Sequence, residues 1–360
     1  MNFDLSDEHH MFVSAIERFA APIDVAARRR LRLSPAGYDR ARWTQLADMG
    51  LIALAAGADA GGLGGSAVDL ALVAQAIGAA NAPDPLIELG ILPALLLERG
   101  GAGAALEGVL AGTTIATLAW TERGQRYSLN ATGMKADQNA DGFALTGEKT
   151  MVPGALLADL FIVTADVGGA TACFLVPKDA PGLCLRAYRL ADGSIAGELT
   201  LARTPATARL ALDNAGLAAM AADMRLYAAA EMVGLSQRLL DDTLAYVKQR
   251  EQFGIAIGSF QALQHRLVDC YARQEQSRSM LYRAMLTDRA DAATWHRAAA
   301  GAKAFIGENS NAIAREAVQM HGGMGITDEL AIGHALKRVL VLDRLFGDAD
   351  TALADYALAA

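Results

Sequence analysis

Residues 246–266, YVKQREQFGIAIGSFQALQHR, lie where one long helical pattern ends and the next begins. Met220–Arg250, upstream of this break, carries no proline, and Gln261–Asp288 follows the break. A second break, HGGMGI, separates Trp295–His321 from Leu330–Leu358. Because four long helices with short connections commonly pack antiparallel, these segments predict a four-helix bundle in the last third of the chain.

The first of these helices is rich in small side chains. They include Ala228, Ala229, Ala230, Gly234 and Ser236. Since the distance between two packed helices depends on the side chains at their contact, we expect this helix to approach a neighbour closely.

The rest of the chain forms two further blocks. Up to residue 115, apolar residues recur at helical spacing, as they do around Trp43, Leu46, Met49 and Leu51. From residue 116 to 213, short segments such as FALTGEKTMV and DLFIVTAD are separated by Gly, Pro or Asp, which is typical of antiparallel strands. We therefore expect an α+β multidomain chain with an N-terminal helical domain (1–115), a middle β-barrel or sandwich (116–213) and a C-terminal four-helix bundle (214–360).

A glycine-rich stretch, GGLGGS at residues 61–66, has two interpretations. One is a phosphate cradle, although no strand precedes the stretch and the third glycine of GxGxxG is missing. The other is a loop that ends in a capping box, in which Ser66 and Asp69 open a helix. We favour the second interpretation.

Composition excludes several classes of protein. The chain has 360 residues, of which 53% are hydrophobic and 20% charged, so it is not intrinsically disordered. The net charge of −8 argues against nucleic acid as a partner, because phosphate binding needs a basic face. The one basic cluster, Arg28, Arg29, Arg30 and Arg32, lies between helical stretches and favours a solvated helix face or an ion-paired contact.

Cysteine usage and hydropathy indicate the compartment. The three cysteines, Cys173, Cys184 and Cys270, show no CxxC spacing, which argues against a disulfide framework or a structural zinc site. The first ten residues, MNFDLSDEHH, do not resemble a secretory signal. The longest apolar run, Gly90–Leu97, is too short to span a bilayer. We therefore expect a cytoplasmic protein without membrane insertion.

Two predicted helix ends carry the residues best suited to bind a ligand. Arg250, Gln252 and Phe253 lie beside a glycine turn, and Gln319 precedes the pair Gly322-Gly323. Arginine binds phosphate with two parallel hydrogen bonds, and glycine lets a backbone N–H approach a phosphate closely. An ordinary glycine C-cap with a neighbouring arginine explains the same residues equally well. We find no hydrolase motif, and the six histidines form no metal-ligand pair.

The motifs REQFGIAIGSFQALQH (250–265) and AVQMHGGMGI (317–326) resemble those of acyl-CoA dehydrogenases, and the order of the blocks is similar over essentially the whole chain. The resemblance implies the acyl-CoA dehydrogenase fold, FAD as cofactor, and a dimer or a dimer of dimers. It implies that one set of residues contacts the adenosine and pyrophosphate of an FAD held mainly by a neighbouring subunit. These are Arg250, Gln252, Phe253, Phe260, Gln261, Gln319, Gly322 and Gly323.

The resemblance also implies a reaction, the α,β-dehydrogenation of an acyl-CoA thioester. In the family a carboxylate removes the α proton while hydride leaves the β carbon for the flavin. Electrons then pass to an electron-transfer flavoprotein. Acyl-CoA and that flavoprotein are therefore the expected partners, and Thr121 is expected on the flavin side.

The sequence departs from the family at the catalytic base. Counted without gaps from Gly322-Gly323, the turn that holds the usual glutamate falls on Leu345-Phe346-Gly347-Asp348, with Phe346 at the base position. The alternative position in the family, directly before an arginine that resembles Arg225, is Met224. Neither position carries a carboxylate.

The flavin side departs as well. The family's threonine-glutamate-proline loop reads Thr121-Glu122-Arg123 here, and the bulky Arg126 and Tyr127 replace small residues. The segment that faces the flavin ring reads Met151-Val152-Pro153, in which proline offers no N–H.

Three hypotheses follow from these departures. The chain is catalytic and uses Asp348 or Asp350 as a relocated base, or it is the non-catalytic subunit of a heteromeric acyl-CoA dehydrogenase, or it is a related flavin oxidase or monooxygenase. A helix N-cap or a solvated turn explains the two aspartates equally well. We expect Arg225 on the substrate side, and Glu308 in a salt bridge within the bundle.

Overall fold

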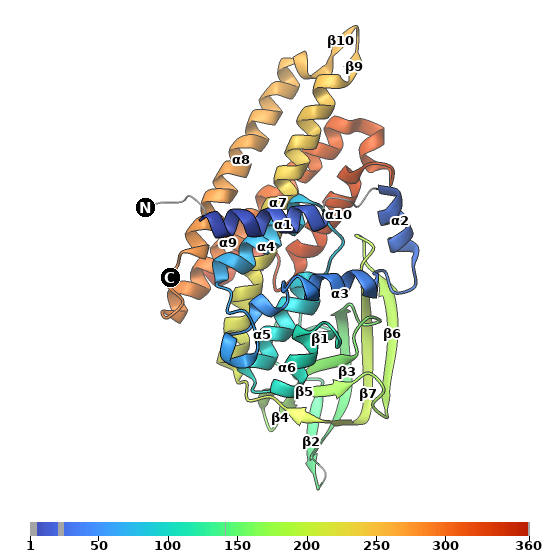
Figure 1. The fold of residues 1–360 in the computed structure, drawn as a ribbon, viewed down its shortest axis with the longest axis vertical. Coiled ribbons are helices and arrows are strands. Elements are labelled where there is room, and N and C mark those ends of the chain that lie inside the picture. The colour runs from blue at the N-terminus through green and yellow to red at the C-terminus, as the bar shows by residue number, and fades with distance from the viewer. Residues whose placement is uncertain (1–5, 21–24, 141, 359–360) are drawn as a thin grey trace. The chain divides into compact units, whose positions relative to one another are not determined.

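The computed structural model describes residues 6–20, 25–140 and 142–358, and its described residues form two compact units (Figure 1). The first unit holds the described residues of Met1–Arg30 together with Ala67–Pro83 and Ala222–Ala360. The second holds Leu31–Ser66 and Asp84–Ala221. Segments that are distant in the sequence therefore share a core. The domain limits at residues 115 and 213 stay predictions.

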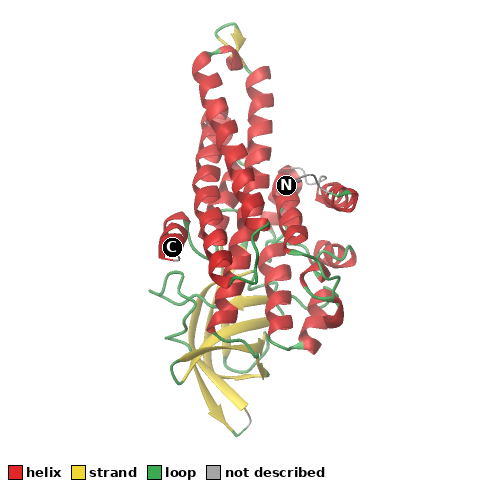
Figure 2. Ribbon diagram, turned by 90° about the vertical axis from the view of Figure 1, so that its left-hand side faces the viewer, coloured by secondary structure: helices red, strands yellow, loops and turns green. Residues whose placement is uncertain are grey.

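The first unit is helical, and its long helices lie side by side (Figure 2). Its helices are α1 (Asp7–Ala20), α4 (Ala67–Ala79), most of α7 (Asn214–Gln249), α8 (Gln261–Met285), α9 (Ala292–His321), α10 (Ala331–Arg344) and α11 (Ala349–Leu358). Short elements join them: strands β9 (Glu251–Gln252) and β10 (Ile255–Ala256), and the 3₁₀ turns η4 (Ile257–Ser259) and η5 (Gly322–Ile326).

The prediction that Leu330–Leu358 forms one helix is wrong. The segment forms two helices, α10 and α11, separated by a turn at residues 345–348. Phe346 has a φ of 56° and Gly347 a φ of 113°. A right-handed α-helix cannot continue through backbone with these angles.

Small residues bring α4 and α7 together, which confirms that α7 approaches a neighbour closely and identifies that neighbour as α4. A Cβ added to Gly234 would lie 2.0 Å from the carbonyl oxygen of Gln75. A Cβ added to Gly78 would lie 2.1 Å from the carbonyl oxygen of Glu231. Any side chain at either position would therefore force the two backbones apart.

The arginine cluster is helical rather than a connection between helices. It lies on α2 (Val25–Leu33), none of whose described residues is buried. The guanidinium of Arg28 donates a hydrogen bond to the carbonyl of Asn81. Arg29 and Arg30 are exposed, as a solvated helix face predicts, whereas Arg28 and Arg32 are half-buried.

The second unit combines helices with the middle β-sheet. Its helical elements are α3 (Arg40–Asp48), the 3₁₀ turns η1 (Ala53–Ala55) and η2 (Ala58–Ala60), the π-helical turn η3 (Ile87–Ile91), α5 (Leu92–Arg99) and α6 (Gly103–Leu110). Its strands are β1 (Ala116–Ala119), β2 (Lys135–Asn139), β3 (Gly142–Pro153), β4 (Leu160–Val167), β5 (Ala170–Pro177), β6 (Leu183–Arg189), β7 (Ile195–Ala206) and β8 (Ala208–Arg209).

The strands form one sheet in the order β6-β7-β3-β2-β4-β5-β8, with β1 beside β4. Most pairs are antiparallel as expected, but β1 pairs parallel to β4, and β2 meets β4 in parallel at Lys135 and Asp166. The prediction that the strands pair only antiparallel is therefore wrong, because strand periodicity carries no information on strand direction. The core includes Phe161, Phe174 and Leu199, none of which is accessible to solvent.

The glycine stretch at residues 61–66 packs on the preceding turns. The N–H groups of Gly62, Leu63 and Gly65 donate to the carbonyls of Gly57, Ala53 and Leu54. A Cβ on Gly62 would lie 2.0 Å from the carbonyl oxygen of Ala56. These glycines allow close packing, and their bonded N–H groups rule out the phosphate cradle.

Among the described residues, no helix combines the length and hydropathy that a membrane span requires. The same part of the chain contains no cluster of His, Cys, Asp or Glu placed to hold a metal ion.

Candidate functional site

The motif at residues 250–261 forms a hairpin beyond the ends of α7 and α8 (Figure 1). Strands β9 and β10 pair antiparallel, and the turn residues Phe253 and Gly254 have φ angles of 57° and 82°. Two successive positive φ angles are typical of the tight hairpin turn that matches strand twist. The turn leaves the Phe253 ring 94% exposed. Its described aromatic neighbour is Phe260, at 6.2 Å between ring centroids in an edge-on arrangement.

The structure brings the second motif to the same end of the bundle. The ring of His321, at the end of α9, stacks on Tyr246 near the end of α7, with centroids 4.2 Å apart. Arg266, in the first turns of α8, donates through Nε to Glu316 of α9 at 2.6 Å. These contacts place Gln319 and the pair Gly322-Gly323 at the end of the bundle from which the hairpin extends. Gln261, the first residue of α8, lies there too.

Gly322 is the C-cap of α9. Its φ is 59°, and its N–H donates to the carbonyl of Gln319. The C-cap interpretation therefore describes Gly322. Gly323 is exposed, and a Cβ added there would meet nothing within 4 Å.

Several groups at this end make no internal contact. In residues 6–20, 25–140 and 142–358, no hydrogen bond or ion pair engages the exposed guanidinium of Arg250. Gln252 donates through Nε2 only to the adjacent carbonyl of Glu251, at 2.7 Å. Ile326 is 75% exposed. An arginine beside exposed apolar surface, with an open glycine nearby, suits a ligand with phosphate groups and a flat apolar part.

The turn at residues 345–348 is the second predicted site, and its groups are bonded internally. Phe346, at the predicted base position, is only 3% exposed, and Met224 is fully buried. Arg225 of α7 donates through Nε to the Phe346 carbonyl at 2.8 Å and pairs with Asp355 at 2.5 Å. Arg225 therefore fastens the turn and α11 to α7.

Asp348 caps α11. Its Oδ1 accepts the Thr351 N–H at 2.9 Å, and its Oδ2 accepts Arg344 Nη1 at 2.7 Å. Both carboxylate oxygens therefore have partners, which matches the helix N-cap interpretation. Asp350 lies in the first turn of α11 and is exposed.

Lys303 lies beneath this turn and is a residue that the sequence analysis missed. Its Nζ donates to the carbonyls of Asp343 at 2.7 Å and Gly347 at 2.6 Å, and the residue is fully buried. Burial lowers the pKa of the Lys303 ammonium to about 7, although the Asp343 carboxylate partly opposes this shift. The available signal was one lysine within the small and apolar stretch AAAGAKAFIG.

In the second unit, Glu122 organises the loop of residues 121–134. Its carboxylate accepts Lys149 Nζ at 2.7 Å and the N–H groups of Gly133, Thr132 and Met134 at 2.6, 3.0 and 3.1 Å. Burial alone would raise the pKa of Glu122, but the hydrogen bonds from Lys149 and the loop N–H groups lower it to about 2. Glu122 therefore stays ionised and holds the loop in place.

The neighbouring backbone offers few free donors. The Thr121 carbonyl accepts the Thr150 N–H at 2.8 Å. The Met151 N–H donates to the Tyr188 hydroxyl at 3.2 Å, and Pro153 has no N–H. Arg126 has a φ of 48°. Thr121 is half-buried, and a role for its side chain toward flavin stays a prediction.

The prediction that Glu308 forms a salt bridge within the bundle is wrong. Glu308 is exposed on α9, and within the described part of the chain it forms no ion pair. Helical periodicity placed the residue on α9 correctly but did not show which face of α9 the bundle covers.

Comparisons with known proteins identify the family. Models of the N-terminal, middle and C-terminal domains of acyl-CoA dehydrogenases match residues 6–116, 117–203 and 216–358. The acyl-CoA dehydrogenase IpdE2 of Mycolicibacterium smegmatis is 32% identical over 333 residues, which cover 92% of this chain and 91% of the relative.

Two solved structures are similar over nearly their full length. A chain of the ChsE4-ChsE5 complex from Mycobacterium tuberculosis has a TM-score of 0.90 and 26% identity, covering 99% of this chain and 98% of that chain. The FAD complex of PigA has a TM-score of 0.88 and 26% identity, with the same coverage. The chain belongs to the acyl-CoA dehydrogenase family, whose fold it shares.

Proposed function

We propose that this chain is a subunit of a FAD-dependent acyl-CoA dehydrogenase that supplies a nucleotide-binding surface and leaves the catalytic base to a partner subunit. The observation that carries this proposal is the turn at residues 345–348. Removal of an α proton needs a carboxylate that is free to reach the substrate. Phe346 has none, and both carboxylate oxygens of Asp348 are engaged by Thr351 and Arg344. Asp350 lies in the first turn of α11, where it lines a pocket formed with α8 and α9.

The bundle end fits the nucleotide part of FAD. When bound, FAD would accept hydride from the acyl β carbon, and its electrons would pass to an electron-transfer flavoprotein. Arg250, whose guanidinium is exposed and unbonded among the described residues, would pair with the pyrophosphate. Gln252, Gln261 and Gln319 would supply amide groups for further hydrogen bonds.

Two more features at this end support FAD binding. The rings of Phe253 and Phe260 present apolar surface for the adenosine. Gly323 leaves open space in which the nucleotide can approach the backbone. FAD in the similar PigA structure is consistent with this assignment.

The groups expected on the flavin-ring side are less suited to a cofactor. Pro153 offers no donor, and the Met151 N–H is already bonded to Tyr188. Arg225, expected near the substrate, is engaged by Phe346 and Asp355. An assembly of two different chains, as the name of the similar ChsE4-ChsE5 complex describes for that protein, would let a partner supply the missing groups.

The test is to purify the chain alone and together with a second dehydrogenase subunit that carries an intact glutamate. We expect the chain alone to show no turnover of acyl-CoA with an electron-accepting dye, and the mixed assembly to bind FAD and turn over. Stoichiometric FAD and turnover from this chain alone would refute the proposal. Oxygen consumption without dye reduction in the assembly would instead identify an oxidase or monooxygenase.

A further inference from the structure

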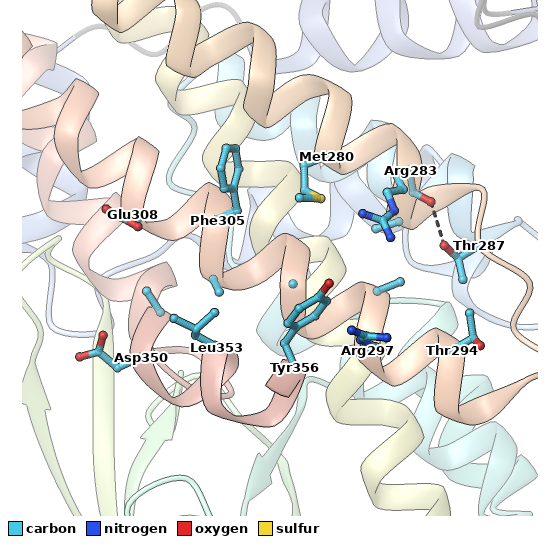
Figure 3. A pocket seen from close by; sticks show the side chains of 15 residues that line it. Met280, Arg283, Thr287, Thr294, Arg297, Phe305, Glu308, Asp350, Leu353 and Tyr356 are labelled. Atoms are coloured by element: carbon cyan, nitrogen blue, oxygen red, sulfur yellow. Dashed lines mark hydrogen bonds between the residues drawn. The ribbon is translucent and has the colours of Figure 1, made fainter. Parts of the chain in front are cut away.

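A pocket of about 400 Å³ lies between α8, α9 and α11 in the first unit (Figure 3). It is lined by the last turns of α8, beginning at Met280, and so lies at the opposite end of that helix from the hairpin. The volume falls in the range of roughly 300–1,000 Å³ that is usual for small-molecule sites. The pocket is thus separate from the proposed nucleotide surface.

The middle of the pocket is apolar. Met280, Phe305 and Leu353 line it together with several alanines. The ring of Tyr356 projects into it (Figure 3), and a Cβ on Gly301 would lie 2.9 Å from that ring. An apolar wall of this kind favours a ligand with an apolar body.

One end of the pocket is cationic. Arg283 and Arg297 lie there with Thr287 and Thr294 (Figure 3). The Arg297 guanidinium lies over the Tyr356 ring, 4.6 Å from its centroid, and Arg297 Nε is buried without a hydrogen-bond partner. Within the described residues, neither arginine forms an ion pair. A buried donor without an acceptor is costly, and an anionic ligand would supply the acceptor.

The other end is acidic. Glu308 and Asp350 lie there, away from the two arginines (Figure 3). Neither carboxylate forms an ion pair with a described residue. An anion is therefore attracted to one end of the pocket and repelled from the other, so the charges orient a ligand that has one negative group.

We propose that this pocket binds a monocarboxylate with an unbranched apolar tail, with its carboxylate at Arg283 and Arg297 and its tail against Phe305 and Leu353. A dicarboxylate would place its second charge near Glu308 and Asp350 and would bind more weakly. The ligand is chemically similar to the free acid of an acyl group, but the site does not depend on bound FAD or on catalysis.

The test uses calorimetric titration of the purified chain with octanoate, suberate and octylamine. These probes share an eight-carbon chain and differ in the charge at its ends. We expect octanoate to bind at least about tenfold more tightly than either of the others, because octylamine brings a cation to the two arginines and suberate brings a second carboxylate to the acidic end. Equal binding of octanoate and suberate, or no binding of octanoate, would overturn the proposal.

Variants locate the binding. Arg297→Gln should weaken octanoate binding about tenfold or more, because it removes the cationic partner of the carboxylate. Arg315→Gln, which removes an exposed arginine elsewhere on α9, is the matched control and should have no effect. The double change Glu308→Gln with Asp350→Asn should raise the affinity for suberate toward the affinity for octanoate. Equal octanoate affinity in both arginine variants would place the binding elsewhere and refute the assignment.

Two further measurements keep the test decisive. Circular dichroism and the thermal midpoint show whether Arg297→Gln is folded. If it is not, the octanoate affinity of Arg297→Lys and the relative affinities of the wild-type chain for the three probes test the proposal instead. Sedimentation measures assembly. If Arg297→Gln changes the oligomeric mass and octanoate does not bind, the pocket is an interface between copies of the chain and the proposal fails.

Discussion

The bundle end at residues 250–261 and 319–323 differs from the turn at residues 345–348 in where its functional groups find partners. At the bundle end, Phe253 is 94% exposed and the Arg250 guanidinium has no bond among the described residues. At the turn, Arg225, Asp348 and Lys303 are all bonded within the chain. Groups without internal partners contribute little to folding, so their presence points to binding, whereas groups with internal partners serve stability first.

The loop at residues 121–134 behaves like the turn. Glu122 receives hydrogen bonds from Lys149 and from consecutive loop N–H groups, and therefore acts as the centre of a folded loop. The contrast between outward-facing and internally bonded groups makes four predictions.

The largest expected effect is on the loop. Lys149→Met would leave the Glu122 carboxylate buried without its cation, which typically costs about 3–5 kcal/mol of the free energy of unfolding. Urea unfolding measures this loss. The double variant Glu122→Gln with Lys149→Met should recover much of it, because no buried charge remains. Equal stability of Lys149→Met and wild type would show that the loop does not depend on this ion pair.

The second effect concerns the bundle end. Arg250→Gln should weaken FAD binding to the assembled enzyme about 10- to 100-fold, because a charged hydrogen bond contributes about 1.5–3 kcal/mol. Its thermal midpoint should stay unchanged, since the guanidinium makes no internal bond. Lys248→Gln removes a nearby exposed cation and serves as the control. Loss of stability with unchanged FAD affinity would show that Arg250 serves the fold and not FAD binding, which contradicts the comparison between the two regions.

The third prediction is a pH dependence at the turn, and its size is given for each pH unit. The pKa of Lys303 is about 7 in the folded chain and 10.5 when the side chain is free. Between these values the unfolded chain holds one more proton, so stability from this group rises with pH by about 1.4 kcal/mol per unit. Below pH 7 both states are protonated and the dependence disappears.

Lys303→Met should remove this slope from the free energy of unfolding measured between pH 7 and 10. Lys248→Met, which changes an exposed lysine, should retain the slope. Parallel pH profiles for wild type and Lys303→Met would show that the buried ammonium does not titrate in this range.

The smallest effect is at the helix cap. Asp348→Ala should cost about 0.5–2 kcal/mol of the free energy of unfolding, and Asp348→Asn much less, because asparagine also caps helices. Both variants should keep the turnover of the mixed assembly. If Asp348→Asn abolishes turnover while FAD stays bound, Asp348 is the relocated base and the turn is catalytic.

Sequence reasoning reached the long bundle helices and the β block because each depends on local signals, and it placed the two motifs at helix ends. Apolar periodicity and chain breaks are written into consecutive residues. The close approach of α7 to a neighbouring helix also followed, since Gly234 and its small neighbours are visible in the sequence, but only the structure showed that this neighbour is α4. The residue types of the proposed nucleotide surface were equally visible, because exposed motif residues need no tertiary partner to be recognised.

Other features could not be predicted from the sequence because they depend on distant residues. The break between α10 and α11 rests on a positive φ at Phe346, a conformation that few non-glycine residues adopt. The parallel pairing of β1 with β4 joins segments about 40 residues apart, which strand periodicity does not encode. The exposure of Glu308 depends on which face of α9 its neighbours cover.

By itself, the sequence determined the family, the order of helical and β blocks, and the lack of a carboxylate at Phe346 and Met224. Only the tertiary structure decided that Asp348 caps a helix, that Arg225 and Lys303 bind the turn, and that two arginines and two acids face one pocket. The physical reason is the distance along the chain between the residues that interact. Local patterns specify elements through neighbouring residues, whereas the partner of a charged side chain is set by chain segments that meet only after folding.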